Sequence, residues 1–448
     1  MKNVIAVRRE DLSKKGEQRV AIPPNLAGTI AGAGHRLLVQ SRAHHETGAI
    51  KRAFADALYS ETGAEITEDL SGADVVFGLK EIERQHIMPD KAYYFFSHTH
   101  KGQKKNRPLL ATLVEKNATV VDYELITDDQ GRRVVTAFTY FAGYAGMIDS
   151  LWTLGRRLAS EGIENAFQAI PQSIATGGLD AAKRIVTEVG TTIRERGTPA
   201  QLPPVIACFL GEGKTSTGAR EIYDLLPVTA VTIDQLADVF ENGSRDQVYK
   251  LVIDIPEMYR LKADSSHHGK SFSRQDLFQL YFREYGQFET NVDRIFPYCM
   301  LLMNCILWAP EYPRLITLDE AKSWYVQHQT LRVVGDITCD PEGALQFSQE
   351  TWIDDPVFIY NPATGTQTMG IDGDGIAVMA VTNLPCEFPA DASSQFGRDI
   401  SPLVESIISA DYRAETVDDS GLDEAVKRAT LLWRGKFTPP YQYMAEYI

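Results

Sequence analysis

The stretch VIACFLGEGKTSTGAREI, residues 205–222, joins an apolar strand to a glycine-rich turn and the start of a helix. In this order the first glycine allows a tight turn, the second lets the backbone approach a pyrophosphate, and the third lets the helix pack closely. The helix N-terminus then offers free N–H groups and a partial positive charge to an anion. The stretch therefore predicts a dinucleotide-binding turn made by Gly211, Gly213, Lys214, Thr215 and Gly218.

The turn departs from the standard fingerprint in two respects. Its third glycine, Gly218, comes five residues after Gly213, and not three as in the fingerprint. The next strand in the sequence, Thr229–Thr232, is followed by a carboxylate only at Asp234, whereas an acidic residue at a strand end commonly holds a ribose 2′-hydroxyl. A plain strand-to-helix loop is the alternative interpretation, and the missing carboxylate favours NADP over NAD.

Length and composition indicate a globular chain of two domains. The sequence has 448 residues, of which 44% are hydrophobic and 23% charged, and this length exceeds one ordinary core. The net charge of −15 argues against nucleic acid or an anionic membrane surface as a partner. No apolar run is long enough to span a membrane, and charge enters the N-terminus too early for a signal peptide. We expect a cytoplasmic protein that acts on small molecules, and a homo-oligomer is compatible with the sequence.

The order of elements indicates α/β structure in both halves of the chain. Short β-rich runs at Val4–Val7, Asp74–Lys80 and Ala118–Asp122 alternate with helical patterns in the first third, which predicts a parallel sheet. An apolar stripe from Met147 to Leu158 predicts a long helix, and a second α/β unit begins at Val205. We also expect helices at Gly48–Thr62, Cys299–Trp308 and Leu422–Trp433.

Charged side chains cluster at the predicted strand ends of the first domain. Lys80, His98, Lys101 and Glu124 each follow a predicted strand, and the carboxyl ends of parallel strands meet at one edge of a sheet. Cations there can hold a substrate with several carboxylates, and a His–Lys pair can exchange protons with an amine. Reductive amination requires both functions. Singly, each residue is better explained as a solvated side chain, whereas four of them at successive strand ends favour a functional site.

The histidines and cysteines do not predict a metal site. His98 and His100 are two residues apart, but no third ligand lies beside them in the sequence at the spacing of a metal site. The five cysteines are scattered without a Cys-x-x-Cys pair, so we expect buried free thiols.

Several motifs together resemble one family over nearly the whole chain. The family is that of lysine-ketoglutarate reductase and saccharopine dehydrogenase, distantly related to alanine dehydrogenase, and the reductase branch is the more similar. The segments that carry the resemblance are Glu17–Pro23, Gly78–Glu81, Phe96–Gln103, Asp122–Glu124, Ala142–Ile148, the Gly211 turn, Asn304–Trp308, Pro313–Leu315, Gly335–Asp340 and Asn383–Pro385.

The resemblance implies a fold and a reaction. The implied fold is α/β with two Rossmann-like domains: an interrupted substrate domain at residues 1–140 and 389–448, and an inserted dinucleotide-binding domain at residues 141–388, with the active site in the cleft. The implied reaction is reductive condensation of L-lysine with 2-oxoglutarate to saccharopine, with NADPH. By resemblance, Lys80 and His98 form the acid–base pair. The residues expected at the substrate are Arg19, Lys101, Glu124, Arg133 and Asp336, and Asn383 and Leu384 join the Gly211 turn at the cofactor.

The departures from the family pattern leave alternatives open. Thr382 stands where relatives often carry an acidic residue, and Glu212 brings a carboxylate to the phosphate region. An NAD-dependent lysine-forming saccharopine dehydrogenase or an opine-type dehydrogenase for another amine is the same-fold alternative. A catalytically silent sensor of amino acid or nucleotide is the alternative of another class, although the presence of both Lys80 and His98 argues against it. We expect the chain to lack the second, glutamate-forming dehydrogenase domain of bifunctional relatives.

Overall fold

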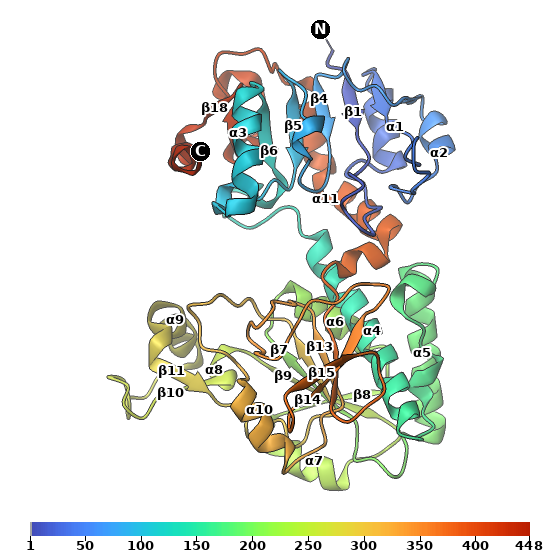
Figure 1. The fold of residues 1–448 in the computed structure, drawn as a ribbon, viewed down its shortest axis with the longest axis vertical. Coiled ribbons are helices and arrows are strands. Elements are labelled where there is room, and N and C mark those ends of the chain that lie inside the picture. The colour runs from blue at the N-terminus through green and yellow to red at the C-terminus, as the bar shows by residue number, and fades with distance from the viewer. Residues whose placement is uncertain (1) are drawn as a thin grey trace. The chain divides into compact units, whose positions relative to one another are not determined.

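A computed structural model describes residues 2–448 and divides them into two compact units (Figure 1). Unit 1 comprises Met1–Phe138 together with Pro389–Ile448, and unit 2 comprises Thr139–Phe388. Each unit is built around an eight-stranded sheet. The predicted α/β fold class is therefore confirmed.

The sheet of unit 1 is parallel except at one edge. Its strand order is β18-β17-β6-β5-β4-β1-β2-β3, and all neighbours from β6 to β3 pair in parallel. β17 joins β6 antiparallel, so the C-terminal segment completes the N-terminal sheet. The strands are β1 (Ile5–Val7), β2 (Leu37–Val39), β3 (Glu65–Ile66), β4 (Val75–Phe77), β5 (Ala92–Phe95), β6 (Thr119–Asp122), β17 (Thr430–Trp433) and β18 (Lys436–Phe437).

Both faces of this sheet are buried. Val75 and Phe77 pack into one core cluster, whereas Val76 between them packs into another on the opposite face. This alternation follows from the two-residue period of a strand, and it explains why the strands read as continuous apolar runs. Polar side chains are consequently found at the strand ends.

The helices of unit 1 come from both chain segments. They are α1 (Pro24–Gly32), α2 (Asp56–Ser60), α3 (Arg107–Glu115), α11 (Pro389–Ser409) and α12 (Glu424–Arg428). The expected helix at Gly48–Thr62 was wrong for its first half, where an isolated bridge joins Ala43 to Ile50. The expected helix at Leu422–Trp433 was wrong for its second half, because Thr430–Trp433 pairs with β6 as a strand.

The sheet of unit 2 has the order β15-β14-β16-β13-β12-β7-β9-β8. The six strands from β16 to β8 are parallel, and β14 and β15 are antiparallel. The strands are β7 (Ile206–Leu210), β8 (Val228–Val231), β9 (Val248–Ile253), β12 (Leu301–Asn304), β13 (Val333–Asp336), β14 (Val357–Asn361), β15 (Thr366–Met369) and β16 (Ile376–Met379).

Helices and a two-stranded antiparallel sheet complete unit 2. This small sheet pairs β10 (Tyr259–Leu261) with β11 (Phe288–Thr290). The helix expected at Cys299–Trp308 was wrong, since its centre forms β12 in the middle of the sheet; a short apolar run fits a buried strand as well as a helix. The helices are α4 (Ala137–Ser160), α5 (Leu179–Arg196), α6 (Lys214–Tyr223), α7 (Leu236–Asn242), α8 (Ile255–Met258), α9 (Arg274–Glu284) and α10 (Leu318–Tyr325).

Two features of the chain as a whole were also expected from the sequence. The five cysteines are free thiols, and all but Cys339 are buried. None of the helices formed by residues 2–448 combines the length and apolarity needed to cross a bilayer.

Helices α4 and α6 touch backbone to backbone through two glycines. A β-carbon at Gly218 would collide with the carbonyl oxygen of Tyr140, and one at Gly143 would collide with the carbonyl oxygen of Thr215. The third glycine of the turn is therefore required for packing α6 on α4. This contact gives a physical reason for its displacement from the fingerprint position.

The glycine contact gives a first prediction. Gly218→Ala should lower the free energy of unfolding by about 1–3 kcal/mol, as overpacking of a close contact typically does. Gly286→Ala is the matched control, because a β-carbon there meets nothing within 4 Å. Thermal unfolding of both variants tests this, and an unchanged melting temperature of Gly218→Ala would contradict the described packing.

A buried pair of carboxyl groups lies in unit 2. Asp149 of α4 and Glu387 share a hydrogen bond, and both side chains are buried. Asp149 Oδ1 also accepts from Ser173 N at 2.7 Å, and Glu387 Oε2 accepts from Ile174 N at 3.1 Å. Burial, and then the Asp149 carboxylate, raises the pKa of Glu387 well above its usual range, and burial raises the pKa of Asp149. The pair therefore holds a proton in the folded state.

This pair predicts a pH dependence of stability. A carboxyl whose pKa is raised by folding contributes stability that is full below its unfolded pKa and is lost as the pH rises through its folded pKa. Glu387→Gln keeps a hydrogen-bond donor that does not titrate. Melting temperatures measured from about pH 5 to pH 9 should fall less steeply for Glu387→Gln than for the unmodified chain. Glu405→Gln, on an exposed position of α11, should keep the original slope, and parallel curves for all three proteins would refute the shared proton.

Candidate active site

The strand ends of unit 1 bring a set of charged residues together. Lys80 and Glu81 follow β4, His98 follows β5, and Glu124 follows β6. These parallel strands end at one edge of the sheet. His98 Nε2 lies 3.9 Å from Glu124 Oε2, as expected from the strand ends. His98 Nδ1 also lies 2.6 Å from Glu81 Oε1, a contact that the sequence did not predict.

His98 has a backbone conformation that few residues adopt. Its φ is +51°, in the left-handed region, and such a residue costs of order 1–3 kcal/mol unless its surroundings hold it. The buried Asp122 carboxylate holds it here: Oδ2 accepts from Ser97 N at 2.9 Å, from Ser97 Oγ at 2.7 Å and from His98 N at 3.0 Å. Asp122 therefore fixes the turn that presents the imidazole.

The His98 ring is oriented by Glu81. Nδ1 lies 2.6 Å from Glu81 Oε1, and Nε2 lies 3.9 Å from Glu124 Oε2. Burial opposes ionisation of Glu81, but hydrogen bonds from His98 and Lys14 outweigh it and lower the pKa of Glu81. An ionised Glu81 accepts the Nδ1 proton, and this leaves Nε2 as the nitrogen that can exchange protons.

Glu124 forms ion pairs with Lys101 and Arg133, two cations that were predicted at the substrate site. Lys101 Nζ lies 2.7 Å from Oε2 and Arg133 Nη2 lies 3.0 Å from Oε1. Burial would raise the pKa of Glu124, but these cations and His98 lower it. Glu124 is therefore ionised and sets the positions of Lys101 and Arg133.

Arg19 lies in a buried ion pair. Its Nε and Nη2 donate to the two oxygens of Glu17 at 2.8 and 2.6 Å, and its guanidinium stacks 4.3 Å from the centroid of the Phe138 ring. Burial opposes ionisation of Glu17, but Arg19 and then Lys80 lower its pKa to about 2. Glu17 thus links Arg19 electrostatically to Lys80.

Sequence reasoning missed the carboxylates that organise this site. Glu17, Glu81 and Asp122 lay within the quoted motifs, but their roles depend on which strand ends are neighbours. The prediction that no third ligand accompanies the histidines also needs correction: potential ligand atoms of His100, Asp122 and Glu124 lie within 4.8 Å of one another. Because Glu124 already contacts Lys101 and Arg133, we infer no metal from this group.

In unit 2 the Gly211 turn has the geometry of a dinucleotide cradle. Gly211 has φ +90° and follows β7 directly. Gly213 N-caps α6, and a β-carbon added to it would meet nothing within 4 Å. That open space at the N-terminus of a ten-residue helix fits the close approach of a pyrophosphate. Lys214 and Thr215 begin the helix. The residues present thus fit a dinucleotide.

The sheet order changes which carboxylate is expected at the ribose. The next strand in the sequence, β8, is at the sheet edge, and it is β9 that pairs with β7. Asp234 therefore follows the wrong strand, whereas Asp254 follows β9 directly. The argument for NADP from a missing carboxylate loses its basis.

Of the remaining predicted residues of unit 2, Asp336 and Leu384 are buried and Asn383 is half-buried. Asp336 ends β13, and Asn304, at the end of the adjacent β12, donates to its Oδ1 at 2.8 Å. Burial raises the pKa of Asp336. Leu384 is buried and close to Gly146 of α4, and Asn383 precedes it at the start of a short 3₁₀ helix. Asp336 belongs to unit 2, and its place at the substrate stays a prediction.

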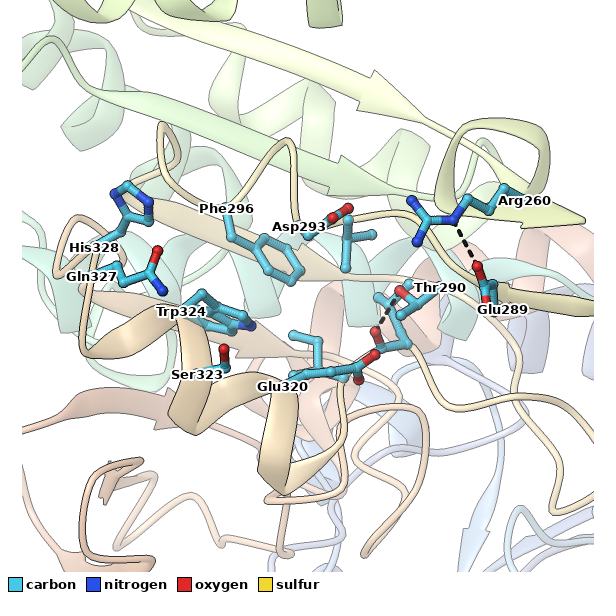
Figure 2. Close-up of a pocket in the computed structure, with 13 residues that line it drawn as sticks. Arg260, Glu289, Thr290, Asp293, Phe296, Glu320, Ser323, Trp324, Gln327 and His328 are labelled. Carbon is cyan, nitrogen blue, oxygen red and sulfur yellow. Dashed lines mark hydrogen bonds and ion pairs between the residues drawn. The ribbon is translucent and has the colours of Figure 1, made fainter. Parts of the chain in front are cut away.

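A separate cavity of about 350 Å³ occurs in unit 2 (Figure 2). It is lined by residues of the β10–β11 sheet and of α10, and none of its lining residues belongs to the Gly211 turn. Its charged groups are largely engaged: Arg260 pairs with Glu289 at 2.9 Å, and Glu320 accepts from Thr317. It is not the predicted cofactor site.

Comparisons with known proteins agree with the fold. Residues 6–145 match the family model of the alanine dehydrogenase/PNT N-terminal domain. An L-alanine dehydrogenase structure superposes with a TM-score of 0.62 at 17% identity, over 99% of both chains. A transhydrogenase from Sinorhizobium meliloti gives a TM-score of 0.58 at 14% identity, over 97% of this chain and 100% of that chain.

Sequence relatives cover almost the whole chain. Alpha-aminoadipic semialdehyde synthase of Arabidopsis thaliana is 35% identical over 98% of this chain and 41% of its own length. The mitochondrial enzyme of that name from Bos taurus is 29% identical over 99% of this chain and 48% of its own length. The chain thus spans less than half the length of these synthases. The NAD(+), L-lysine-forming saccharopine dehydrogenase of Neurospora crassa is 23% identical over 89% of this chain and 90% of its own length. The chain is therefore homologous to alpha-aminoadipic semialdehyde synthases and saccharopine dehydrogenases, in agreement with the resemblance of its motifs.

Proposed function

We propose that this protein is a nicotinamide-dependent reductase that condenses L-lysine with 2-oxoglutarate to saccharopine. The observation that carries the proposal is the His98 group, in which an oriented imidazole, Lys80 and several cations share one sheet edge. Homology to alpha-aminoadipic semialdehyde synthases over 98% of the chain supports the choice of substrates.

We further propose a division of labour between the units. Unit 1, which nearly coincides with the predicted substrate domain of residues 1–140 and 389–448, supplies the substrate residues. Unit 2, which nearly coincides with the predicted domain of residues 141–388, supplies the cofactor cradle. Arg133 and Lys101 would attract substrate carboxylates, because together they bring two positive charges to the single carboxylate of Glu124. A bound reduced nicotinamide would supply the hydride.

Proton handling falls to His98 and Lys80. With Nδ1 donating to Glu81 at 2.6 Å, His98 Nε2 is available to take a proton from the lysine ammonium and return it when water leaves the carbinolamine. Lys80 interacts electrostatically with Glu17, and it would hold the keto-acid oxygen. The argument for NADP from an absent carboxylate has lost its basis, and the resemblance to the reductase branch remains the ground for expecting NADPH.

An absorbance assay of the reduced nicotinamide tests the reaction. The purified protein should oxidise NADH or NADPH only when lysine and 2-oxoglutarate are both present, and mass spectrometry should identify saccharopine. Omission of either substrate is the control. If no amine and keto-acid pair supports oxidation, the enzyme is refuted and a ligand sensor remains; another amine giving faster turnover would indicate a different opine-type dehydrogenase.

Two substitutions test the assigned roles. His98→Ala and Lys80→Met should each lower kcat about 10²–10⁴-fold, the usual contribution of a general acid–base group. Their dissociation constants for the nicotinamide nucleotide should remain unchanged, because the cofactor cradle lies in unit 2. His45→Ala, at an exposed histidine of unit 1, is the control, and unchanged rates for the first two variants would refute their roles.

A further inference from the structure

We propose that Asp254 selects NADH over NADPH by accepting a hydrogen bond from the adenine-side ribose hydroxyl. The inference rests on the proposed function, since it assigns the coenzyme of that reaction. It reverses the coenzyme preference expected from the sequence.

The first argument is the position of Asp254 relative to the glycine turn. β9 pairs in parallel with β7 from Ile206↔Tyr249 to Leu210↔Ile253, so Asp254 is level with Gly211. The two strand ends are joined directly, because Gly211 N donates to Ile253 O at 2.7 Å. In a dinucleotide fold the acidic residue at the end of the strand beside the glycine turn accepts from the ribose hydroxyl. Asp254 is in that place.

The second argument explains why the sequence pointed elsewhere. β8 follows α6 in the chain but pairs only with β9 at the outer edge of the sheet. The carboxylate expected at the ribose therefore comes one strand and one helix later in the sequence than the chain order suggests. Asp234 follows β8, and β9 lies between β8 and β7.

The third argument is the charge around this position. Arg274 Nη2 lies 2.7 Å from Glu212 Oε1, and Arg274 Nε lies 2.8 Å from Glu257 Oε1. Glu257 Oε2 in turn accepts from Asp254 N at 3.0 Å. Three carboxylates, Glu212, Asp254 and Glu257, therefore surround one guanidinium. A 2′-phosphate would meet a net negative site, whereas a 2′-hydroxyl can donate to a carboxylate.

Asp254 also has a structural role that has to be separated from this one. Its Oδ1 accepts from Ile255 N at 2.9 Å and caps the short helix α8. Asn and Ser cap helices as well as Asp does, so capping alone does not require a charge. Burial, and to a lesser extent the Glu212 carboxylate, raises the pKa of Asp254.

Binding measurements without substrates test the proposal. Dissociation constants of NADH and NADPH are measured by titration calorimetry for the unmodified chain, for Asp254→Asn, and for Asp234→Asn as the matched control. The unmodified chain should bind NADH at least about tenfold more tightly than NADPH. Asp254→Asn keeps the cap and should reduce this ratio about tenfold or more, with an unchanged melting temperature, whereas Asp234→Asn should keep the ratio.

Each other outcome has a definite meaning. Equal or tighter binding of NADPH by the unmodified chain overturns the role of Asp254 and leaves the proposed reaction intact. An unchanged ratio in Asp254→Asn does the same. Binding of neither nucleotide overturns this inference together with the proposed function, so the two failures are distinguishable.

Discussion

Burial of both sheet faces is the constraint on which the rest of the structure depends. Val75, Val76 and Phe77 leave no polar position within β4, because successive side chains enter opposite apolar cores. The same holds for β7, where all five residues are buried. Charged groups can therefore gather only where strands end, and both candidate sites occur there. The acid–base residues of unit 1 and the glycine turn of unit 2 thus both lie at the carboxyl ends of parallel strands.

Carboxylates that sequence reasoning passed over organise the unit 1 site. Asp122 holds a strained turn, Glu81 orients an imidazole, and Glu17 and Glu124 arrange the cations. Each remains ionised although burial opposes it, because a cation or a donor lies within hydrogen-bond distance. These ion pairs and hydrogen bonds offset the free energy that is lost when the charges are removed from water. They also fix the side chains in place, as is usual where side chains must be positioned for chemistry.

The sequence was informative where the signal is local. Strand β7 and the glycine-rich turn at Gly211 follow from short-range rules, and the strand ends correctly grouped His98 with Glu124. Predictions from the sequence were wrong where an assignment depends on which strands are neighbours in the sheet. The apolar run at Leu301–Asn304 reads equally as helix or strand until its neighbours are known. The order β7, β9, β8 cannot be read from chain order, so Asp234 was examined in place of Asp254. Gly218 looked like an irregular fingerprint because its partner, α4, precedes the turn in the chain.

The antiparallel pairing of β17 with β6 has a consequence for how the protein is made. Unit 2 contains all its strands within Thr139–Phe388, so it can fold as soon as that segment leaves the ribosome. Unit 1 begins first but must wait for Pro389–Ile448, whose α11 and β17 cover surfaces that stay open until then. Its N-terminal strands are thus exposed during synthesis of the entire middle of the chain. Such delayed, non-local closure is slow and favours aggregation.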